Sequence, residues 1–449
     1  MSVAEDASAL PRQSQSSALL ISAFVAFEFA LTIAVFFPGV MSEDARYLYD
    51  DIARGFRGDW QSPVMAVLWS IIDPIAPGTA SMFLLIVTIY WLAFGILAFA
   101  LARRSVALAF VLLLLALSPP AFVFLSMVWR DVLFAGSWLL AAVLCFAFAE
   151  RDGGQRRVIQ TLALCLLAFG FLLRPNALPA APLLMAYIVW PARFSLKRAA
   201  VIFLPAAAAL AVLLQIVYYT ALGAERQHIV QSIMVFDLGG ITHFAQENQY
   251  PVSWSTPQDA LLTTDCYRPN DWSVYWTHGP CMFVMRRLEQ EKIFGSATLV
   301  EAWARAIWKH PAAYLRHRVA FMWDFLTGAN SSLWTDDGDN SKETFAGSRV
   351  FAALQASYEA LKATPLFRPA TWLLALIAVV VLAGPRRDTP AGAFAIGICG
   401  SATVYILSFA AVGAAADFRY VYWAVLASIA GSLVVGSAYL PRKLAHSIA

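Results

Sequence analysis

About ten apolar runs recur along the chain, and their lengths decide what it can fold into. A crossing helix needs about 20 apolar residues because the hydrocarbon core of a bilayer is about 30 Å thick. The long runs are Ala18–Phe37, Ala80–Leu101, Ala199–Ala221, Ala370–Gly384, Ala391–Val412 and Val421–Leu440. Shorter runs form two pairs, Val106–Val123 with Val132–Glu150 and Val158–Leu173 with Leu178–Trp190. The sequence therefore predicts an all-α polytopic membrane protein of about ten transmembrane helices.

Composition agrees with this interpretation and excludes other classes. Hydrophobic residues make up 60% and charged residues 14% of the 449 residues, and this balance is far from that of a soluble domain. The net charge of +3 is small, and the basic residues are spread in short clusters between the apolar runs. We therefore expect membrane lipid, and no nucleic acid, as a partner.

The basic clusters fall in alternate loops, which predicts the orientation of the chain. These clusters are Arg12, Arg103/Arg104, Arg151/Arg156/Arg157, Arg193/Lys197/Arg198, Arg386/Arg387 and Arg442/Lys443. Positively charged loops stay in the cytoplasm, so both termini are expected inside and the opposite loops outside the plasma (inner) membrane. Three regions follow: an N-terminal membrane module over 1–222, a long extracytoplasmic loop region over 223–367, and C-terminal membrane helices over 368–449.

Cysteine positions fit this orientation. Cys145, Cys165 and Cys399 lie within apolar runs, whereas Cys266 and Cys281 both lie in the long outer loop. An oxidising compartment permits a bond between the latter two, and the bond would close a short loop. We expect a Cys266–Cys281 disulfide, with two free thiols as the alternative.

The long outer loop has a helical pattern of its own. Leu299, Trp303, Ile307 and their neighbours recur at helical spacing until His310-Pro311 interrupts the run. Arginines and lysines between the apolar positions favour a helix lying in the headgroup region. We interpret this stretch as a lid or wall over an outward cavity, with interfacial helices.

The first outer loop, residues 38–63, contains an acidic pair next to an amphipathic helix. Ala45, Leu48 and Ile52 mark one face of a helix that begins near Ser42. Glu43 and Asp44 then occupy its first turn, where the helix dipole favours an ionised carboxylate. Such a carboxylate can accept a proton, but an acidic residue at this position more commonly just caps the helix.

The run from Asp44-Ala-Arg46-Tyr47 to Gly58-Asp59-Trp60-Gln-Ser-Pro63 resembles the first outer loop of GT-C glycosyltransferases, particularly the aminoarabinose transferase and protein mannosyltransferase branches. The resemblance implies a GT-C-like architecture and a general base immediately after the first span. That base corresponds to Asp44, with Glu43 as the competing assignment. Gln61-Ser62-Pro63 departs from the His- or Lys-Pro-Pro pattern, and no Trp-Trp-Asp oligosaccharyltransferase signature is present, which disfavours protein N-glycosylation.

Other outer stretches resemble bacterial membrane proteins of polysaccharide assembly and supply further candidates. The stretches are Trp129-Arg130-Asp131, Arg174-Pro175-Asn176, the run Trp308-Lys-His310-Pro311 and Asp417-Phe418-Arg419-Tyr420. The candidates for substrate contacts in these stretches and in the first loop are Arg46, Tyr47, Asp59, Trp60, Asp131, Asn176, His310, Asp417 and Tyr420. Asp59 and Trp60 have the alternative role of anchoring the loop at the interface.

Three arginines lie at predicted outer ends of spans, and each offers a phosphate-binding guanidinium. Arg130, Arg174 and Arg419 come from separate loops and are expected to converge on a donor phosphate. The alternative for each is a side chain that merely reaches the interface. Asp131 and Asp417 adjoin two of these arginines, which suggests local ion pairs; direct contact with sugar hydroxyls is the alternative.

Together these features predict a membrane glycosyltransferase that moves a sugar from a polyprenyl-phosphate donor to a glycan or lipid acceptor with inversion. The histidines show no paired ligand spacing, so no metal site is predicted, and a requirement for a divalent metal is left open. No firm cofactor is expected beyond the lipid-linked donor substrate. The alternatives are a flippase for polyprenyl-linked intermediates and an O-antigen polymerase or ligase.

Overall fold

The structure is a computed structural model that describes residues 15–149, 153–276, 279–331, 333–334 and 349–440. Several residues used to predict orientation lie outside these ranges: Arg12, Arg151, Arg442 and Lys443. The described residues are helical, with three isolated bridges between extended segments and no strand. The predicted all-α architecture is therefore confirmed at this level.

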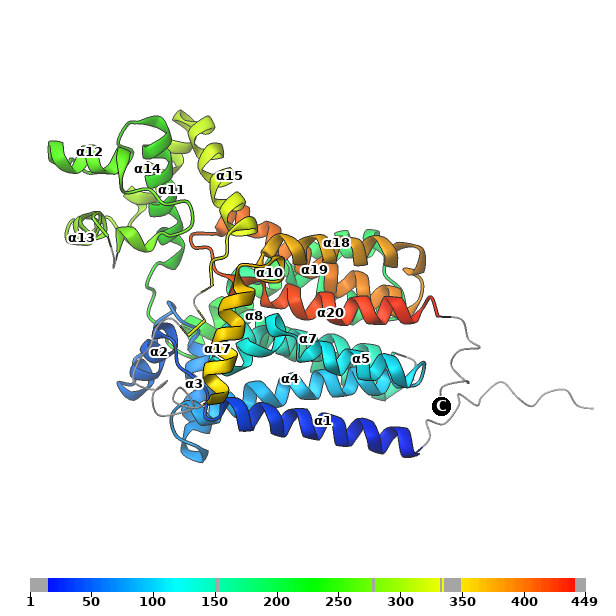
Figure 1. The fold of residues 1–449 in the computed structure, drawn as a ribbon. Helices are drawn as coiled ribbons and strands as arrows, with labels where there is room; N and C mark the ends of the chain where they lie inside the picture. Colours follow the sequence, from blue (N-terminus) through cyan, green and yellow to red (C-terminus); the bar gives the residue numbers. More distant parts are fainter. Residues whose placement is uncertain (1–14, 150–152, 277–278, 332, 335–348, 441–449) are drawn as a thin grey trace, which may run out of the picture.

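Most helices run side by side in one elongated bundle (Figure 1). They are α1 (Gln15–Phe36), α4 (Thr79–Ala102), α5 (Val106–Ala116), α6 (Pro119–Phe122) with η2 (Val123–Ser126), α7 (Arg130–Ala147), α8 (Gly153–Leu173), α9 (Ala181–Val189), α10 (Leu196–Leu214) with the π-helix η4 (Gln215–Ala221), α18 (Pro369–Ala383), α19 (Pro390–Val412) and α20 (Tyr422–Ser437). The first residue of α1 and the last of α20 lie at the same end of the bundle.

Eight of these helices are long and apolar enough to cross a membrane, and a ninth is counted if α5 and the α6–η2 segment form one span. The two parts meet at 64° because Ser118-Pro119-Pro120 interrupts the helix, and proline cannot donate a backbone hydrogen bond. The tenth predicted span contains α9, whose 9 residues are too few to cross a bilayer.

Helices α7 and α20 form the middle of the bundle, and α1, α10 and α18 form its outside. The apolar windows of the first two are 78% buried, whereas that of α10 is 11% buried. Trp138 of α7 packs edge-on against Trp423 of α20 at 5.7 Å and donates to the Leu167 carbonyl at 3.0 Å. Val201 and Leu204 of α10 each expose 75% of their surface, as expected for side chains that face lipid.

One end of the bundle carries the first outer loop and a separate helical head module, residues 229–327 (Figure 1). The loop holds α2 (Glu43–Ala53), α3 (Pro63–Ile72) and η1 (Asp73–Ile75). The head module holds α11 (Ile229–Ala245), α12 (Thr256–Thr264), η5 (Ser273–Tyr275), α13 (Phe283–Gln290), α14 (Ala297–Lys309) and α15 (Pro311–Thr327). The chain returns through α17 (Arg349–Lys362) and η6 (Pro365–Phe367), and two further 3-10 turns are η3 (Pro175–Ala177) and η7 (Gly384–Arg386).

The head module confirms the predicted helix break at His310, which separates α14 from α15. The two tryptophans of α14 face different surroundings. The Trp303 indole donates to Asp237 inside the module at 2.8 Å, whereas Trp308 is 89% exposed. Trp303 therefore points into the head module and not toward a membrane surface, because its N–H has a buried carboxylate partner.

A buried polar cluster joins the head module to the bundle. Asp237 of α11 accepts from Arg318 at 2.6 Å and lies 3.1 Å from His317 Nε2, both on α15. Arg318 also donates to the carbonyl of Gly413, in the loop after α19, at 2.6 Å. Burial lowers the pKa of His317 below its ordinary value, although Asp237 acts in the opposite direction. A buried carboxylate with three donors is fully compensated, so the cluster fixes α15 against the 413–417 loop.

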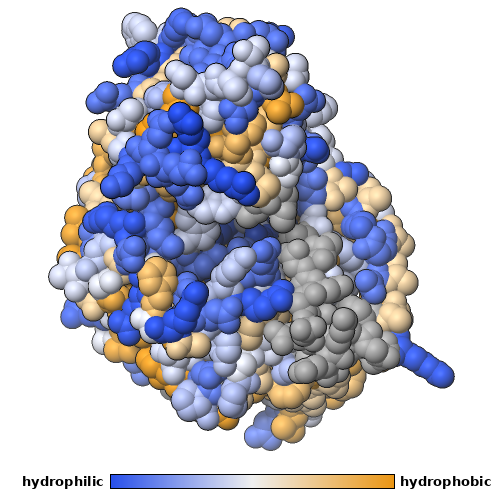
Figure 2. Space-filling model, turned by 90° about the vertical axis from the view of Figure 1, so that its left-hand side faces the viewer, coloured by the Kyte–Doolittle hydropathy of each residue, from blue (hydrophilic) through white to orange (hydrophobic). Residues whose placement is uncertain are grey.

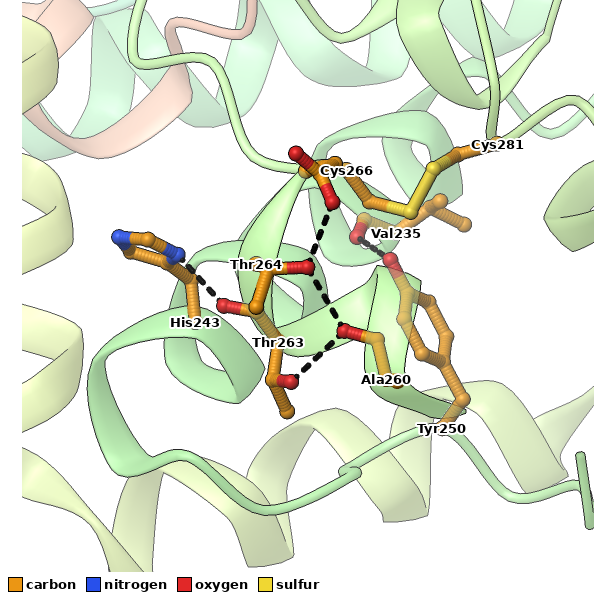
Figure 3. Close-up of a disulfide and its surroundings, with 9 residues drawn as sticks. Val235, His243, Tyr250, Ala260, Thr263, Thr264, Cys266 and Cys281 are labelled. Atoms are coloured by element: carbon orange, nitrogen blue, oxygen red, sulfur yellow. Dashed lines mark hydrogen bonds between the residues drawn. A yellow bond between two sulfur atoms is a disulfide. The ribbon is translucent and has the colours of Figure 1, made fainter. Parts of the chain in front are cut away.

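A disulfide between Cys266 and Cys281 closes a loop at the base of the head module, with Cα atoms 5.5 Å apart. Figure 3 shows this bond next to the end of α12, where Thr263 accepts from His243, and next to Tyr250, which donates to the Val235 carbonyl. The bond joins the two cysteines that the sequence placed in the long outer loop. The bond therefore fixes the two ends of the chain between residues 266 and 281 to each other.

Candidate functional site

A polar recess opens where the first outer loop, α7, α8 and the start of α20 meet. Its cavity has a volume of about 20 Å³ below an open mouth, and Figure 2 shows hydrophilic residues around a hollow on this face. Its lining residues are Asp44, Ala45, Leu48, Gln61, Met65, Val128, Trp129, Arg130, Asp131, Arg174 and Arg419. The recess therefore brings together the acidic residue and the three arginines that the sequence predicted to converge.

Asp44 enters this recess from the first turn of α2. Ser42 caps the helix, as its side chain accepts from the backbone N–H of Ala45. Two side chains then hold the carboxylate: Gln61 donates to Oδ1 at 3.2 Å, and Arg419 Nη2 lies 2.9 Å from Oδ2. The Asp44 side chain keeps 41% of its surface exposed, so an incoming molecule can reach it.

Charge decides the protonation state of Asp44. Burial alone would raise the pKa of this carboxyl, but the three neighbouring arginines outweigh burial and hold the pKa below its ordinary value. The carboxylate is consequently ionised at neutral pH. An ionised carboxylate beside an open recess can accept a hydrogen bond, and then a proton, from a hydroxyl group.

Arg419 lies in the 3-10 turn η8 (Phe418–Val421), whose N-cap is Asp417. Asp417 Oδ1 accepts from the Arg419 backbone N–H at 2.9 Å, and its Oδ2 lies 3.7 Å from Arg419 Nε. The guanidinium also lies over the rings of Trp129 and Tyr420, at 4.9 and 5.2 Å. The local ion pair predicted for Asp417 and Arg419 is therefore present.

Arg174 has a different acidic partner from the one that adjacency suggests. Its Nη2 lies 2.8 Å from Asp131 Oδ1, and the two side chains are only 8% and 5% exposed. The predicted pairing of Asp131 with Arg130 is wrong, because successive residues on a helix point in different directions. Tyr420 lies beneath this guanidinium at 5.0 Å, so it contacts two of the three arginines.

Arg130 is the arginine with spare binding capacity. Its Nη1 donates to the Trp60 carbonyl at 3.2 Å, and among the described residues no carboxylate forms an ion pair with it. Arg174 and Arg419 are both paired with aspartates, so Arg130 offers the guanidinium whose charge is not locally balanced. A recess of this kind favours an anion that accepts bidentate hydrogen bonds.

Several other predicted residues of the first loop lie outside the recess. Glu43 is exposed and accepts from the Tyr47 hydroxyl at 3.0 Å, and Arg46 is half-buried without reaching the lining. Asp59 binds the Tyr219 hydroxyl and the Gln227 backbone N–H, each at 2.7 Å. Asp59 thus ties the first outer loop to η4 and to the segment that follows it.

The remaining predicted residues have separate positions. Trp60 adjoins the recess through its carbonyl, and Asn176 is half-buried in η3. His310 lies in the head module, 3.4 Å from Glu247, and does not line the recess. The structure thus separates His310 from the other candidates because the α14–α15 break stands away from the bundle end.

Sequence reasoning missed Gln61 and Ser42 as parts of the site. Gln61 was noted only as a departure from a family pattern, yet it holds Asp44. Ser42 accepts from the Trp129 indole at 2.7 Å and so ties α2 to the segment before α7. A serine at position 42, just before the helix, is a typical N-cap, and this signal is present in the sequence. Its bond with Trp129, 87 residues away, is not indicated by the sequence.

Metal-ligating side chains do not gather at this site. Within the described residues, no group of three or more His, Cys, Asp or Glu side chains has an arrangement that could hold a metal ion. Comparisons with protein-family models, curated proteins and solved structures found no match to this chain.

Proposed function

We propose that the protein is a membrane glycosyltransferase that moves a sugar from a polyprenyl-phosphate donor to a hydroxyl acceptor at the outer face of the membrane. One observation carries the proposal: an ionised Asp44 shares an open recess with Arg130, an arginine that no carboxylate of the described residues pairs with. The resemblance of the first outer loop to GT-C enzymes supports the same chemistry. The elements that carry the lining residues, among them α2 and the start of α7, lie at one end of the helical bundle (Figure 1), a position that a lipid-borne phosphate could reach.

The reaction would be a single inverting displacement. The acceptor oxygen gives its proton to Asp44 and forms a bond to the anomeric carbon of the donor. The bond from that carbon to the phosphate oxygen breaks, and its electron pair stays on the departing polyprenyl phosphate. Arg130 is placed to bind the developing phosphate charge, which is where an electrostatic contact accelerates the reaction most.

Arg419 would link donor binding to the strength of the base. In the free protein it forms an ion pair with Asp44 and lowers the pKa of that carboxyl. A donor phosphate competes for the same guanidinium, and Asp44 then loses part of its stabilising partner. Its pKa rises toward the ordinary value, which makes it a better proton acceptor once the donor is bound.

Arg174 would contribute little to phosphate binding, because its charge is balanced by Asp131. We therefore rank Arg130 first and Arg419 second as phosphate ligands. Asp131 and Tyr420 would hold the arginine side chains in place, and Gln61 would orient Asp44.

The test is a turnover assay with purified protein and a panel of synthetic polyprenyl-phosphate sugars, in which released polyprenyl phosphate is measured. Asp44→Asn should abolish release of polyprenyl phosphate. Glu43→Gln tests the competing assignment of the base and should retain release if Asp44 is the base. Arg130→Gln should lower kcat/KM about a hundredfold or more, the usual loss for one electrostatic donor to a transition state.

Asp50→Asn is the matched control, because Asp50 is an exposed carboxylate on the same helix, α2, outside the recess. It should leave turnover unchanged. If Asp44→Asn retains turnover with a donor that the wild type uses, Asp44 is not the base. If no lipid-phosphate sugar in the panel is consumed by folded protein, the glycosyltransferase proposal fails.

A further inference from the structure

Three tryptophans form a cluster between the first outer loop and the head module. The Trp60 ring lies 5.8 Å from that of Trp272 and 5.5 Å from that of Trp276, and the last two are 5.9 Å apart. All three side chains are partly exposed. We call this cluster, Trp60 with Trp272 and Trp276, the indole wall.

Hydrogen bonds tie both halves of the indole wall to segments that border the recess. On one side, the Trp60 carbonyl accepts from Arg130, and the next residue, Gln61, donates to Asp44. On the other side, the Trp272 N–H donates to the Ala414 carbonyl at 3.2 Å, three residues before Asp417. The indole wall therefore adjoins two segments that border the recess: the Trp60–Gln61 segment, which contacts Arg130 and Asp44, and the 414–417 segment that leads to Arg419. Its three side chains lie outside the lining of the recess itself.

The segment that carries Trp272 and Trp276 is constrained at both ends. Cys266 and Cys281 close it with a disulfide, and Asp271 forms an antiparallel bridge with Ala415. Rings held in this way lose little freedom when a ligand binds, which lowers the entropic cost of binding.

The indole N–H groups of the wall are also free to bind. Among the described residues, none of the three donates its indole N–H to a protein acceptor. Elsewhere in the chain such groups are used internally, as in Trp129 to Ser42 and Trp303 to Asp237. An aromatic cluster with spare donors suits a ligand that has both an apolar face and hydroxyl groups.

We propose that the indole wall binds a sugar ring of the acceptor, so that the acceptor is a saccharide. This inference rests on the proposed function and narrows its substrate class. A pyranose presents C–H groups on its face, which fit the negative face of an indole, and hydroxyl groups at its edge for the free N–H donors. With one acceptor hydroxyl at Asp44, a neighbouring ring of the same chain lies across the mouth on the wall.

The test measures saccharide binding to the purified full-length protein by saturation-transfer NMR and calorimetry, without any donor. The probes are methyl disaccharides of glucose, galactose, mannose, rhamnose and N-acetylglucosamine. At least one should bind, and Trp272→Ala and Trp276→Ala should each weaken that binding about tenfold. Trp276→Phe, which keeps a ring and most of the packing, should weaken it less.

Trp308→Ala is the matched control, because Trp308 is 89% exposed on α14 and belongs to no aromatic cluster. It should leave saccharide affinity unchanged. A merely structural role of the wall would lower the unfolding temperature of both alanine variants without a selective loss of affinity in the folded fraction. That result, or a panel in which no disaccharide binds, overturns the inference.

Binding and turnover fail separately, so the two proposals can be told apart. Asp44→Asn should lose turnover but still bind saccharide, with a smaller loss of affinity than Trp272→Ala, because the ring contacts come from the indole wall. Loss of saccharide binding in the tryptophan variants combined with full turnover in Asp44→Asn would support the wall and refute the base. In a working enzyme, Trp272→Ala should raise the KM for the acceptor and leave the KM for the donor unchanged.

Discussion

Removing the charge of Asp131 should destabilise the protein strongly, because it leaves Arg174 buried without a counter-ion. The two side chains are 5% and 8% exposed and lie 2.8 Å apart. Breaking a buried pair by removing one partner costs about 3–5 kcal/mol. Asp131→Asn keeps the shape of the side chain, so this cost comes from the charge and not from a new cavity. The equilibrium between folded and unfolded protein should shift by on the order of a hundredfold or more.

The assay is reversible unfolding in mixed micelles with increasing SDS, followed by intrinsic fluorescence. Glu247→Gln is the control, because it breaks an ion pair with Lys309 whose two side chains are more than half exposed. Such a pair adds little stability, so the control should not shift the transition measurably. The double variant Asp131→Asn/Arg174→Gln should lose less than the two single losses added together, by about 0.5–3 kcal/mol.

A small effect would refute this reasoning. If Asp131→Asn shifts the unfolding transition no more than Glu247→Gln does, then Arg174 is not desolvated in the folded protein. The recess would in that case be open to water down to Arg174, and three arginines instead of two would be accessible to a phosphate.

Two further results are expected. The pKa of Asp44 is lowered in the folded state, so its ion pair stabilises the protein fully above about pH 4 and loses that effect as the pH falls further. Melting temperatures between pH 3 and 6 should show this loss in the wild type and not in Asp44→Asn. Replacing Cys266 and Cys281 by serine should lower stability by about 3 kcal/mol, because their separation of 15 residues sets the entropy of the closed loop, and limited proteolysis should then cut between them; an unchanged proteolytic pattern would contradict this.

The transmembrane architecture could be predicted because it depends on composition over long windows. Apolar run length alone located α1, α4, α19 and most other bundle helices, because every backbone group in a bilayer core must be paired within its own helix. The short α9 shows the limit of this reasoning. Its run, Leu178–Trp190, has 13 residues, fewer than the roughly 20 of a span, and only 9 of them, from Ala181 to Val189, are helical.

The convergence of the arginines could also be predicted, because it needs only the knowledge that alternate span ends meet on one side of a membrane. The ion-pair and hydrogen-bond partners of individual side chains could not be predicted. Asp131 binds Arg174 of the neighbouring helix, and Asp59 binds Tyr219 and Gln227, which are 160 and 168 residues away. Such contacts depend on how helices rotate against one another, which periodicity within a single helix does not specify. The role of Asp44 in catalysis stays a prediction.

The attachment of Gly413 to the head module has a mechanical consequence. Arg318 and Trp272 of the head module donate hydrogen bonds to the carbonyls of Gly413 and Ala414, in the segment that leads to Arg419. Asp44, in contrast, belongs to α2. A tilt of the head module therefore acts on the segment that carries Arg419 through hydrogen bonds, and on the Asp44 side only through the ring contacts of Trp60. The distance between Arg419 and Asp44 would therefore depend on the position of the head module. A bulky ligand that displaces the head module would weaken this ion pair without contacting either residue.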